Sequence, residues 1–171
     1  IVPWQLVAEA TGAQLVVAPV LDNGELDMAT FAEQISDRTR FISVVHVSNT
    51  LGTINPVEDI IALAKVRDIP VLVDGAQSAP HMPVDIQAMG ADFYCFSAHK
   101  TYGPSGTGVL WGRLAHLEAM PPYQGGGDMI RTVTFARSEY ADPPQRFEAG
   151  TPNIAGVIAM GKGLEYIESV G

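Results

Sequence analysis

The sequence has few of the residues that mark secreted, membrane-spanning or nucleic-acid-binding proteins. Cys95 is its only cysteine, so an internal disulfide is impossible and a reducing compartment such as the cytoplasm is expected. Ten Lys and Arg residues face nineteen Asp and Glu, a net charge of −9 that disfavours nucleic acids and anionic membranes as partners. No apolar run approaches the roughly 18 residues of a membrane span. We therefore expect a cytoplasmic protein that acts without nucleic acid or membrane.

The length and the apolar content are typical of one globular domain. Of the 171 residues, 47% are hydrophobic, which predicts one sizeable core. The first residues, "IVPWQLVAEATGAQL", begin in an apparent helix without a capping residue or an initiator methionine. We expect the chain to be a segment of a longer protein.

Short apolar runs rich in β-branched residues alternate with helical periods along most of the chain. This alternation predicts an α/β fold with a mainly parallel sheet and flanking helices. The last run follows its predecessor across the short turn "TYGPSG", so it must return as one antiparallel strand. The expected strands are 14–20, 41–48, 70–75, 92–98 and 107–113.

Capping residues and apolar spacing predict three helices. Asp27 can cap the first, which has Met28, Phe31, Ala32 and Ile35 on one face. Asn55 can cap the second, with Pro56 at its first position and Glu58 closing a capping box. The faces expected to be buried are Val57, Ile60, Ile61 and Ala64 in the second helix, and Val157, Met160, Leu164 and Ile167 in a third that begins at about Asn153.

Between about 121 and 153 the composition shifts to Gly, Pro and charged residues with little periodicity. The segment "PPYQGGGDMIRTVTFARSEYADPPQRFEAGTPN" is therefore expected to be irregular. An irregular segment of this length inside a folded domain is usually functional or disordered.

Three of the expected strands end in polar residues. The carboxyl ends of neighbouring strands in an open parallel sheet share one edge, where ligands bind. Side chains that are remote in sequence are thereby brought into one site. The polar strand-end residues are Ser48 and Asn49, then Asp74 and Gln77, then Ser97, His99 and Lys100.

Several familiar motifs fit this chain only in part. "GPSGTGVL" resembles a phosphate-binding P-loop, but Val109 and Leu110 occupy the places of the required Lys and Ser or Thr. The dinucleotide fingerprint fails on glycine spacing, and no second glycine completes a nucleophile elbow around Ser78. One cysteine and four scattered histidines, without an H-E-x-x-H pair, argue against a metal site.

An aspartate at one strand end and a lysine at the next suit pyridoxal 5'-phosphate. This cofactor requires a lysine that forms a Schiff base with its aldehyde and a carboxylate that keeps its pyridine nitrogen protonated. Lys100 and Asp74 offer these two groups. The neighbouring hydrogen-bonding residues would be Ser97 and His99 for the phosphate, and Gln77 and Asn49 for the ring oxygen.

Taken singly, the same residues have simpler interpretations. Asp74 precedes a glycine and could cap a turn. Lys100 could be a strand-end lysine whose amine reaches water while its stem covers apolar surface. The combination of these residues favours the cofactor site.

At these residues the sequence resembles a known family. The similar stretches are "HVSNTLGTINPV", "VDGAQSAPHMPVDIQAMGADFYCFSAHKTYGPSGTGVLWG", "GGGDMI" and "RFEAGTPN". They resemble the Suf-type cysteine desulfurases and selenocysteine lyases of the class V aminotransferase family, over essentially the whole chain. The resemblance implies a homodimeric fold-type I pyridoxal phosphate enzyme. Such an enzyme takes sulfur from L-cysteine as a persulfide, leaves L-alanine, and passes the sulfur to an acceptor protein for iron–sulfur cluster assembly.

The resemblance also assigns roles by position. Lys100 resembles the Schiff-base lysine and Asp74 the partner of the pyridine nitrogen. The segment 121–153 would cross the dimer interface. The remaining counterparts are Gln77 and Asn49 near the ring oxygen or the substrate carboxylate, Ser97 and His99 at the phosphate, and Thr151 at the phosphate of the neighbouring subunit.

The family's catalytic cysteine lies on a loop of a small C-terminal domain, and no residue of this chain corresponds to it. Cys95 lies within an expected strand and is interpreted as a packing residue. Residues 1–171 would thus be part of the cofactor-binding large domain, without its N-terminal part and without the small domain. Selenocysteine as substrate, an aminotransferase, epimerase or kynureninase-like reaction, and a non-catalytic homologue remain open.

Overall fold

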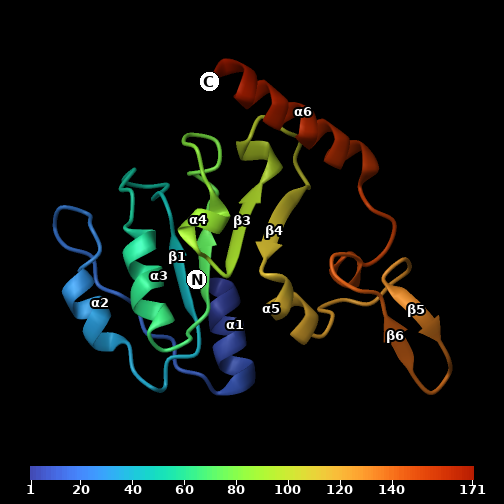
Figure 1. The fold of residues 1–171 in the computed structure, drawn as a ribbon, viewed down its shortest axis with the longest axis horizontal. Coiled ribbons are helices and arrows are strands. Elements are labelled where there is room, and N and C mark those ends of the chain that lie inside the picture. Colours follow the sequence, from blue (N-terminus) through green and yellow to red (C-terminus); the bar gives the residue numbers. More distant parts are fainter.

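Four of the five expected strands form one sheet in the computed structural model, which describes residues 1–171 (Figure 1). The first three strands are parallel, and the fourth runs antiparallel to the third. The expected α/β topology is therefore confirmed. In sheet order the strands are β1 (Ile42–Val45), β2 (Val71–Asp74), β3 (Phe93–Ser97) and β4 (Gly108–Gly112).

The expected strand at 14–20 is wrong. This run forms no regular element, and only Val20 makes an isolated bridge, to Leu26. Val16 and Val17 are exposed. A segment becomes a strand only where a neighbour supplies backbone hydrogen bonds, and β-branched content does not reveal whether that neighbour is present.

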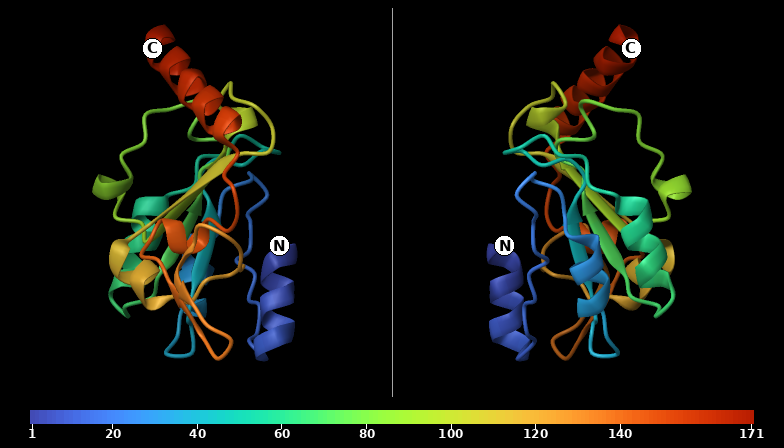
Figure 2. Two further views of the ribbon diagram at one scale, coloured as in Figure 1. Left: turned by 90° about the vertical axis from the view of Figure 1, so that its right-hand side faces the viewer. Right: turned by 90° about the vertical axis from the view of Figure 1, so that its left-hand side faces the viewer.

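Six α-helices flank the sheet or lie at its ends. Figure 2 shows α1 on one face of the sheet and α3 with α4 on the other. No helix combines the length and the apolar character needed to cross a membrane. The helices are α1 (Val2–Thr11), α2 (Met28–Gln34), α3 (Val57–Lys65), α4 (Ile86–Met89), α5 (Leu114–Ala119) and α6 (Ile154–Val170).

Helix α2 begins as expected. The Asp27 carboxylate accepts hydrogen bonds from the backbone N–H and the hydroxyl of Thr30, at 3.0 and 2.7 Å. Phe31 is buried beneath the helix, whereas Ala32 is exposed. The cap therefore matches the sequence, but the apolar face is narrower than its spacing predicts.

Helix α3 begins differently from the expected capping box. Pro56 occupies the N-cap position, and no side chain caps the helix. The Asn55 amide instead donates a 2.8 Å hydrogen bond to the carbonyl of Val45. The prediction that Asn55 caps α3 is therefore wrong, because its side chain donates to a backbone carbonyl at the end of β1.

The core lies between α3 and the sheet. Val57, Ile60, Ile61 and Ala64 are buried as expected, against Val71, Val73 and Tyr94 among others. Only 24 of the 171 residues are buried, so the core is smaller than the apolar content predicts. Helix α1 buries none of its residues, and large apolar side chains are also exposed on β4, in the segment 121–153 and on α6.

Helix α6 lies across the end of the sheet where β3 stops (Figure 1). Asn153 caps it as expected, accepting a hydrogen bond from the N–H of Gly156 at 3.0 Å. Its buried residues are Gly156, Met160 and Gly163, whereas Val157 is exposed, contrary to expectation. Glycines allow a closer backbone approach than apolar side chains would, so the face of α6 that packs is the one that carries the two glycines.

We expect Gly163→Ala to destabilise the protein. A Cβ there would lie 2.6 Å from the carbonyl oxygen of Thr101 and 2.9 Å from the nitrogen of Gly103, and backbone atoms cannot easily move away. The free energy of unfolding, measured by urea denaturation, should fall by about 1–3 kcal/mol.

The matched control lies on the same helix. A Cβ on Gly161 would meet nothing within 4 Å. Because alanine is the better helix former, Gly161→Ala should raise the free energy of unfolding by up to about 1 kcal/mol. Equal effects of the two changes would show that α6 does not pack on the segment after β3.

The segment 121–153 is more regular than its composition predicts. It contains an antiparallel hairpin, β5 (Ile130–Val133) and β6 (Ser138–Tyr140), followed by a short 3-10 turn. In Figure 1 the hairpin lies beyond α5, away from the main sheet, and Phe135 in its turn is fully exposed. The guanidinium of Arg146 anchors the segment by donating hydrogen bonds to the carbonyls of Ala141 and Glu118 at 3.0 and 2.8 Å.

Candidate functional site

Asp74 and Lys100 lie at the carboxyl edge of the sheet, as the sequence predicts. Asp74 is the last residue of β2, where its Cα is in register with Val45 of β1 and Cys95 of β3. Lys100 ends the 3-10 turn Ala98–Lys100 that directly follows β3. The two residues therefore come from neighbouring strand ends.

One oxygen of the half-buried Asp74 carboxylate is engaged and the other is free. Oδ1 accepts a hydrogen bond from the N–H of Ala76 at 2.9 Å, so Asp74 does cap a turn. Oδ2 has no hydrogen-bond partner and stays available to a ligand. The turn-capping role and the ligand-binding role are thus compatible on one side chain.

Lys100 and His99 are both exposed, in a turn whose backbone is tightly held. The carbonyl of Ala98 accepts hydrogen bonds from the N–H groups of Thr101 and Gly103 and from the Thr101 hydroxyl, at 2.9, 2.8 and 3.0 Å. Thr101 is completely buried. Lys100 makes no salt bridge, so its amine is presented on a hydrogen-bonded turn without a competing ion pair.

The other expected site residues differ in how closely they approach this edge. Ser97 is the half-buried last residue of β3, and Gln77 is half-buried in the turn after β2. Asn49 is exposed in the loop after β1, and its side-chain oxygen accepts one hydrogen bond, from the Thr50 hydroxyl at 3.5 Å. Thr151 is exposed in the loop before α6, and its side chain forms no hydrogen bond. Ser97 and Gln77 are thus the half-buried members of the expected set, and Asn49 and Thr151 are its exposed loop members.

The thiol of Cys95 is poorly suited to act as a nucleophile. Cys95 lies within β3 and is half-buried. Burial raises the pKa of the thiol above its ordinary value, and the nearby negative charge of Asp74 raises this pKa further. The thiol therefore stays protonated at neutral pH, which supports its interpretation as a packing residue.

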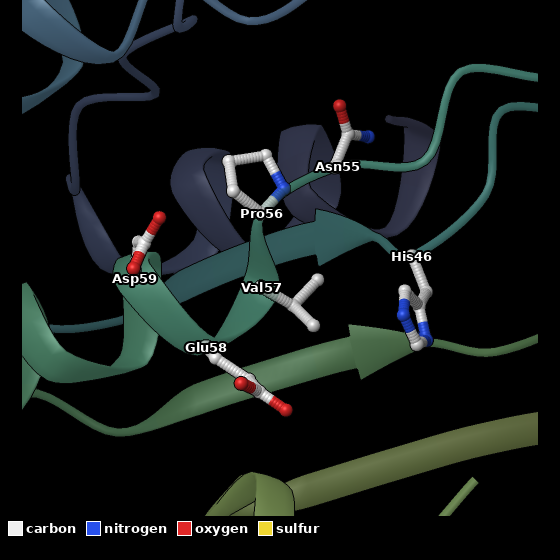
Figure 3. Close-up of a pocket in the computed structure, with 6 residues that line it drawn as sticks. All are labelled: His46, Asn55, Pro56, Val57, Glu58 and Asp59. Atoms are coloured by element: carbon white, nitrogen blue, oxygen red, sulfur yellow. The ribbon is translucent and has the colours of Figure 1, made fainter.

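A polar hollow beside the end of β1 was not anticipated from the sequence. Figure 3 shows its lining around the first turn of α3, with His46, Asn55 and Glu58 among the residues. His46 is 6% exposed, and its Nδ1 has no hydrogen-bond partner. Burial lowers the pKa of His46, while the charge of Glu58 opposes that shift, so the ring stays neutral at pH 7. The sequence feature that could have pointed to His46 is its position directly after β1, two residues before Ser48.

Fold and edge together define a class of protein: an open, mainly parallel α/β domain that offers a lysine and a carboxylate to a ligand at its carboxyl edge. The sequence model of the family described as aminotransferase class-V matches residues 1–171, and the chain belongs to this family.

Named relatives agree with this assignment. The chain is similar to a cysteine desulfurase of Dickeya dadantii (strain 3937), with 53% identity over 100% of this chain and 42% of the relative. Its structure resembles the crystal structure of the cysteine desulfurase CsdA from Escherichia coli, with a TM-score of 0.95 and 42% identity over 98% of this chain and 42% of the other. It also resembles SspA in complex with cysteine, with a TM-score of 0.79 and 28% identity over 96% of this chain and 44% of the other. The chain thus spans less than half the length of these relatives.

Enzymes of this family depend on pyridoxal phosphate, and the residues at the edge fit that group. The free Oδ2 of Asp74 is an acceptor for a protonated pyridine nitrogen, and the unpaired amine of Lys100 suits an aldehyde. The Ser97 hydroxyl and the His99 ring can donate to a phosphate. The set thus offers an amine, a carboxylate and hydrogen-bond donors, which are the kinds of group that fit this cofactor.

Proposed function

We propose that the full-length protein is a pyridoxal-phosphate-dependent cysteine desulfurase. It would transfer the sulfur of L-cysteine to an enzyme thiol, giving L-alanine and an enzyme persulfide for iron–sulfur cluster assembly. The observation that carries the proposal is the likeness to a cysteine desulfurase over the whole chain, at 53% identity. The test is to incubate the purified full-length protein with L-cysteine and a thiol reductant. Stoichiometric alanine and sulfide support the proposal, and a keto acid in their place would indicate another class V reaction.

The chain's own residues would bind the cofactor and move one proton. When bound, pyridoxal phosphate supplies the electron sink for the carbanion that forms at the substrate Cα. Asp74 would keep the pyridine nitrogen protonated through its free Oδ2. Lys100 would hold the cofactor and then act as general base and acid, moving a proton at the substrate Cα. The rigid turn around Ala98 supports this role, because it presents the amine without a competing ion pair.

Hydrogen-bonding residues would orient the cofactor between these two groups. Ser97 and His99 would hold the phosphate, and Gln77 with Asn49 would lie near the ring oxygen or the substrate carboxylate. Thr151 would reach the phosphate of the neighbouring subunit in a homodimer, with the segment 121–153 at the interface. The exposure of Thr151 and of the hairpin turn supports this last assignment.

The remaining assignments concern the whole protein. Residues 1–171 would form part of the cofactor-binding large domain, and the attacking cysteine would lie outside them. The low reactivity of Cys95 supports that placement. The full-length protein would act in the cytoplasm on L-cysteine or selenocysteine and deliver sulfur to an acceptor protein.

The 171-residue chain by itself should show no desulfurase activity. Its one thiol is half-buried in β3 with a raised pKa, so no nucleophile is available to attack the substrate sulfur. Sulfide release from L-cysteine with added pyridoxal phosphate should match a protein-free blank. The full-length protein in the same assay is the positive control. Rapid sulfide release by the short chain would contradict the proposed position of the catalytic thiol.

A further inference from the structure

Beneath the turn that carries Asp74 lies a buried polar pair. The hydroxyl oxygen of Tyr94 is 2.7 Å from Oγ of Ser78. Tyr94 is 1% exposed and Ser78 is 0% exposed, so neither hydroxyl can bind bulk water instead. Breaking this pair would leave a buried polar group unsatisfied, which holds both side chains in one arrangement.

The direction of the hydrogen bonds follows from the acceptors available. The Ser78 hydroxyl donates to the carbonyl of Gly75 at 3.4 Å, so its oxygen accepts the hydrogen of Tyr94. Burial raises the pKa of Tyr94, which keeps the phenol protonated as that donor. A chain of hydrogen bonds thus runs from Tyr94 through Ser78 to the Gly75–Ala76 peptide group, whose N–H is the donor to Oδ1 of Asp74.

Gly75 permits unusually close packing above the phenol ring. A Cβ on Gly75 would lie 1.9 Å from Cζ and 2.0 Å from the hydroxyl oxygen of Tyr94. Tyr94 is in register with Val73, and successive side chains of a strand point to opposite faces. Tyr94 therefore supports the backbone of the turn from the core face, while the Asp74 side chain points to the other face.

We infer that Tyr94, acting through Ser78, is a positioning residue that sets the orientation of the Asp74 carboxylate towards the pyridine nitrogen of the cofactor. The inference rests on the proposed function. The turn after β2 is held at two points, by Ala76 N–H on Oδ1 of Asp74 and by the Ser78 hydroxyl on the Gly75 carbonyl. Loss of the phenol hydroxyl leaves the Ser78 oxygen without its donor and so weakens the second point, and the direction of the free Oδ2 is then less well defined.

The test uses the full-length protein with Tyr94→Phe, Ser78→Ala and the double variant. Tyr166→Phe, on the exposed face of α6, is the control for removing a tyrosine hydroxyl. Three quantities are measured: the dissociation constant of pyridoxal phosphate, the pH at which the visible spectrum of the bound cofactor changes, and the urea midpoint. The pH midpoint reports protonation of the imine between the lysine and the cofactor, which responds through the conjugated ring to the charge at the pyridine nitrogen and is insensitive to overall stability.

Each single variant should raise the dissociation constant about fivefold, as expected for one neutral hydrogen bond, and should shift the pH midpoint. The double variant should do little more than either single one, because both remove the same chain of hydrogen bonds. A lower urea midpoint with unchanged dissociation constant and pH midpoint would overturn the inference and leave a structural role only. If Tyr94→Phe does not fold, the dissociation constant and the pH midpoint of Ser78→Ala test the inference in its place. Failure of the unaltered protein to bind the cofactor would overturn the proposed function itself.

Discussion

Lys100→Ala in the full-length protein is expected to lower alanine formation from L-cysteine by about 10³-fold or more. The variant removes the amine that would hold the cofactor and move the proton at the substrate Cα. The visible absorbance of bound pyridoxal phosphate should change with it, since the covalent link is lost. Both are measured on the same preparation, by amino-acid analysis and by spectroscopy.

The chain provides a matched control for this change. Lys162 lies exposed on α6, where its amine pairs with Glu165 at 2.6 Å. An exposed ion pair of this kind contributes about 1 kcal/mol at most, so Lys162→Ala should leave the rate and the spectrum unchanged. Full activity of the Lys100 variant would rule out the proposed role of this lysine.

Asp74→Asn is expected to lower the same rate by about 10²-fold or more, because an amide cannot stabilise a protonated pyridine nitrogen as a carboxylate does. The substitution is nearly isosteric and retains an oxygen that can accept from Ala76 N–H, so the turn should persist. Steady-state kinetics and the pH dependence of the cofactor spectrum measure the effect. A lower rate with the turn intact would therefore be due to the missing negative charge of Asp74 and not to unfolding.

Asp85→Asn controls for removing a carboxylate that also accepts from a backbone N–H. Asp85 caps α4 through a 2.9 Å hydrogen bond from Ala88 N–H, and it is exposed. Its replacement should leave both the kinetics and the spectrum as they are. A rate for Asp74→Asn equal to that of Asp85→Asn would refute the assignment of Asp74 to the pyridine nitrogen.

The strands that the sequence predicted correctly are those with neighbours in the sheet. β2 is a run of alternately buried residues between two partners, and its apolar pattern reflects that environment. The run at 14–20 has similar β-branched content, but it pairs only at Val20, through an isolated bridge, and composition alone could not distinguish the two. The predictions that Asn55 caps a helix and that Val157 is buried were wrong for a related reason. The environment of each side chain is set by segments that are distant in sequence.

The candidate site was predictable to the level of strand ends. Parallel topology brings Asp74 and Lys100 to one edge whatever the details of their contacts. The free Oδ2 of Asp74, the unpaired Nδ1 of His46 and the support of Tyr94 beneath Gly75 could not be foreseen. These features depend on side-chain directions at close range, which spacing along the chain does not encode.

By itself the sequence determined the α/β class, the edge at which the polar residues meet, and the pairing of a lysine with a carboxylate suited to pyridoxal phosphate. It could do so because the periodicity of apolar residues and the positions of strand ends are local properties of the chain. Only the tertiary structure decided which runs pair, which cap holds each helix, and how Tyr94 and Ser78 support Asp74. Those outcomes depend on which neighbour is available to each hydrogen-bonding group, and the neighbours are supplied by the fold.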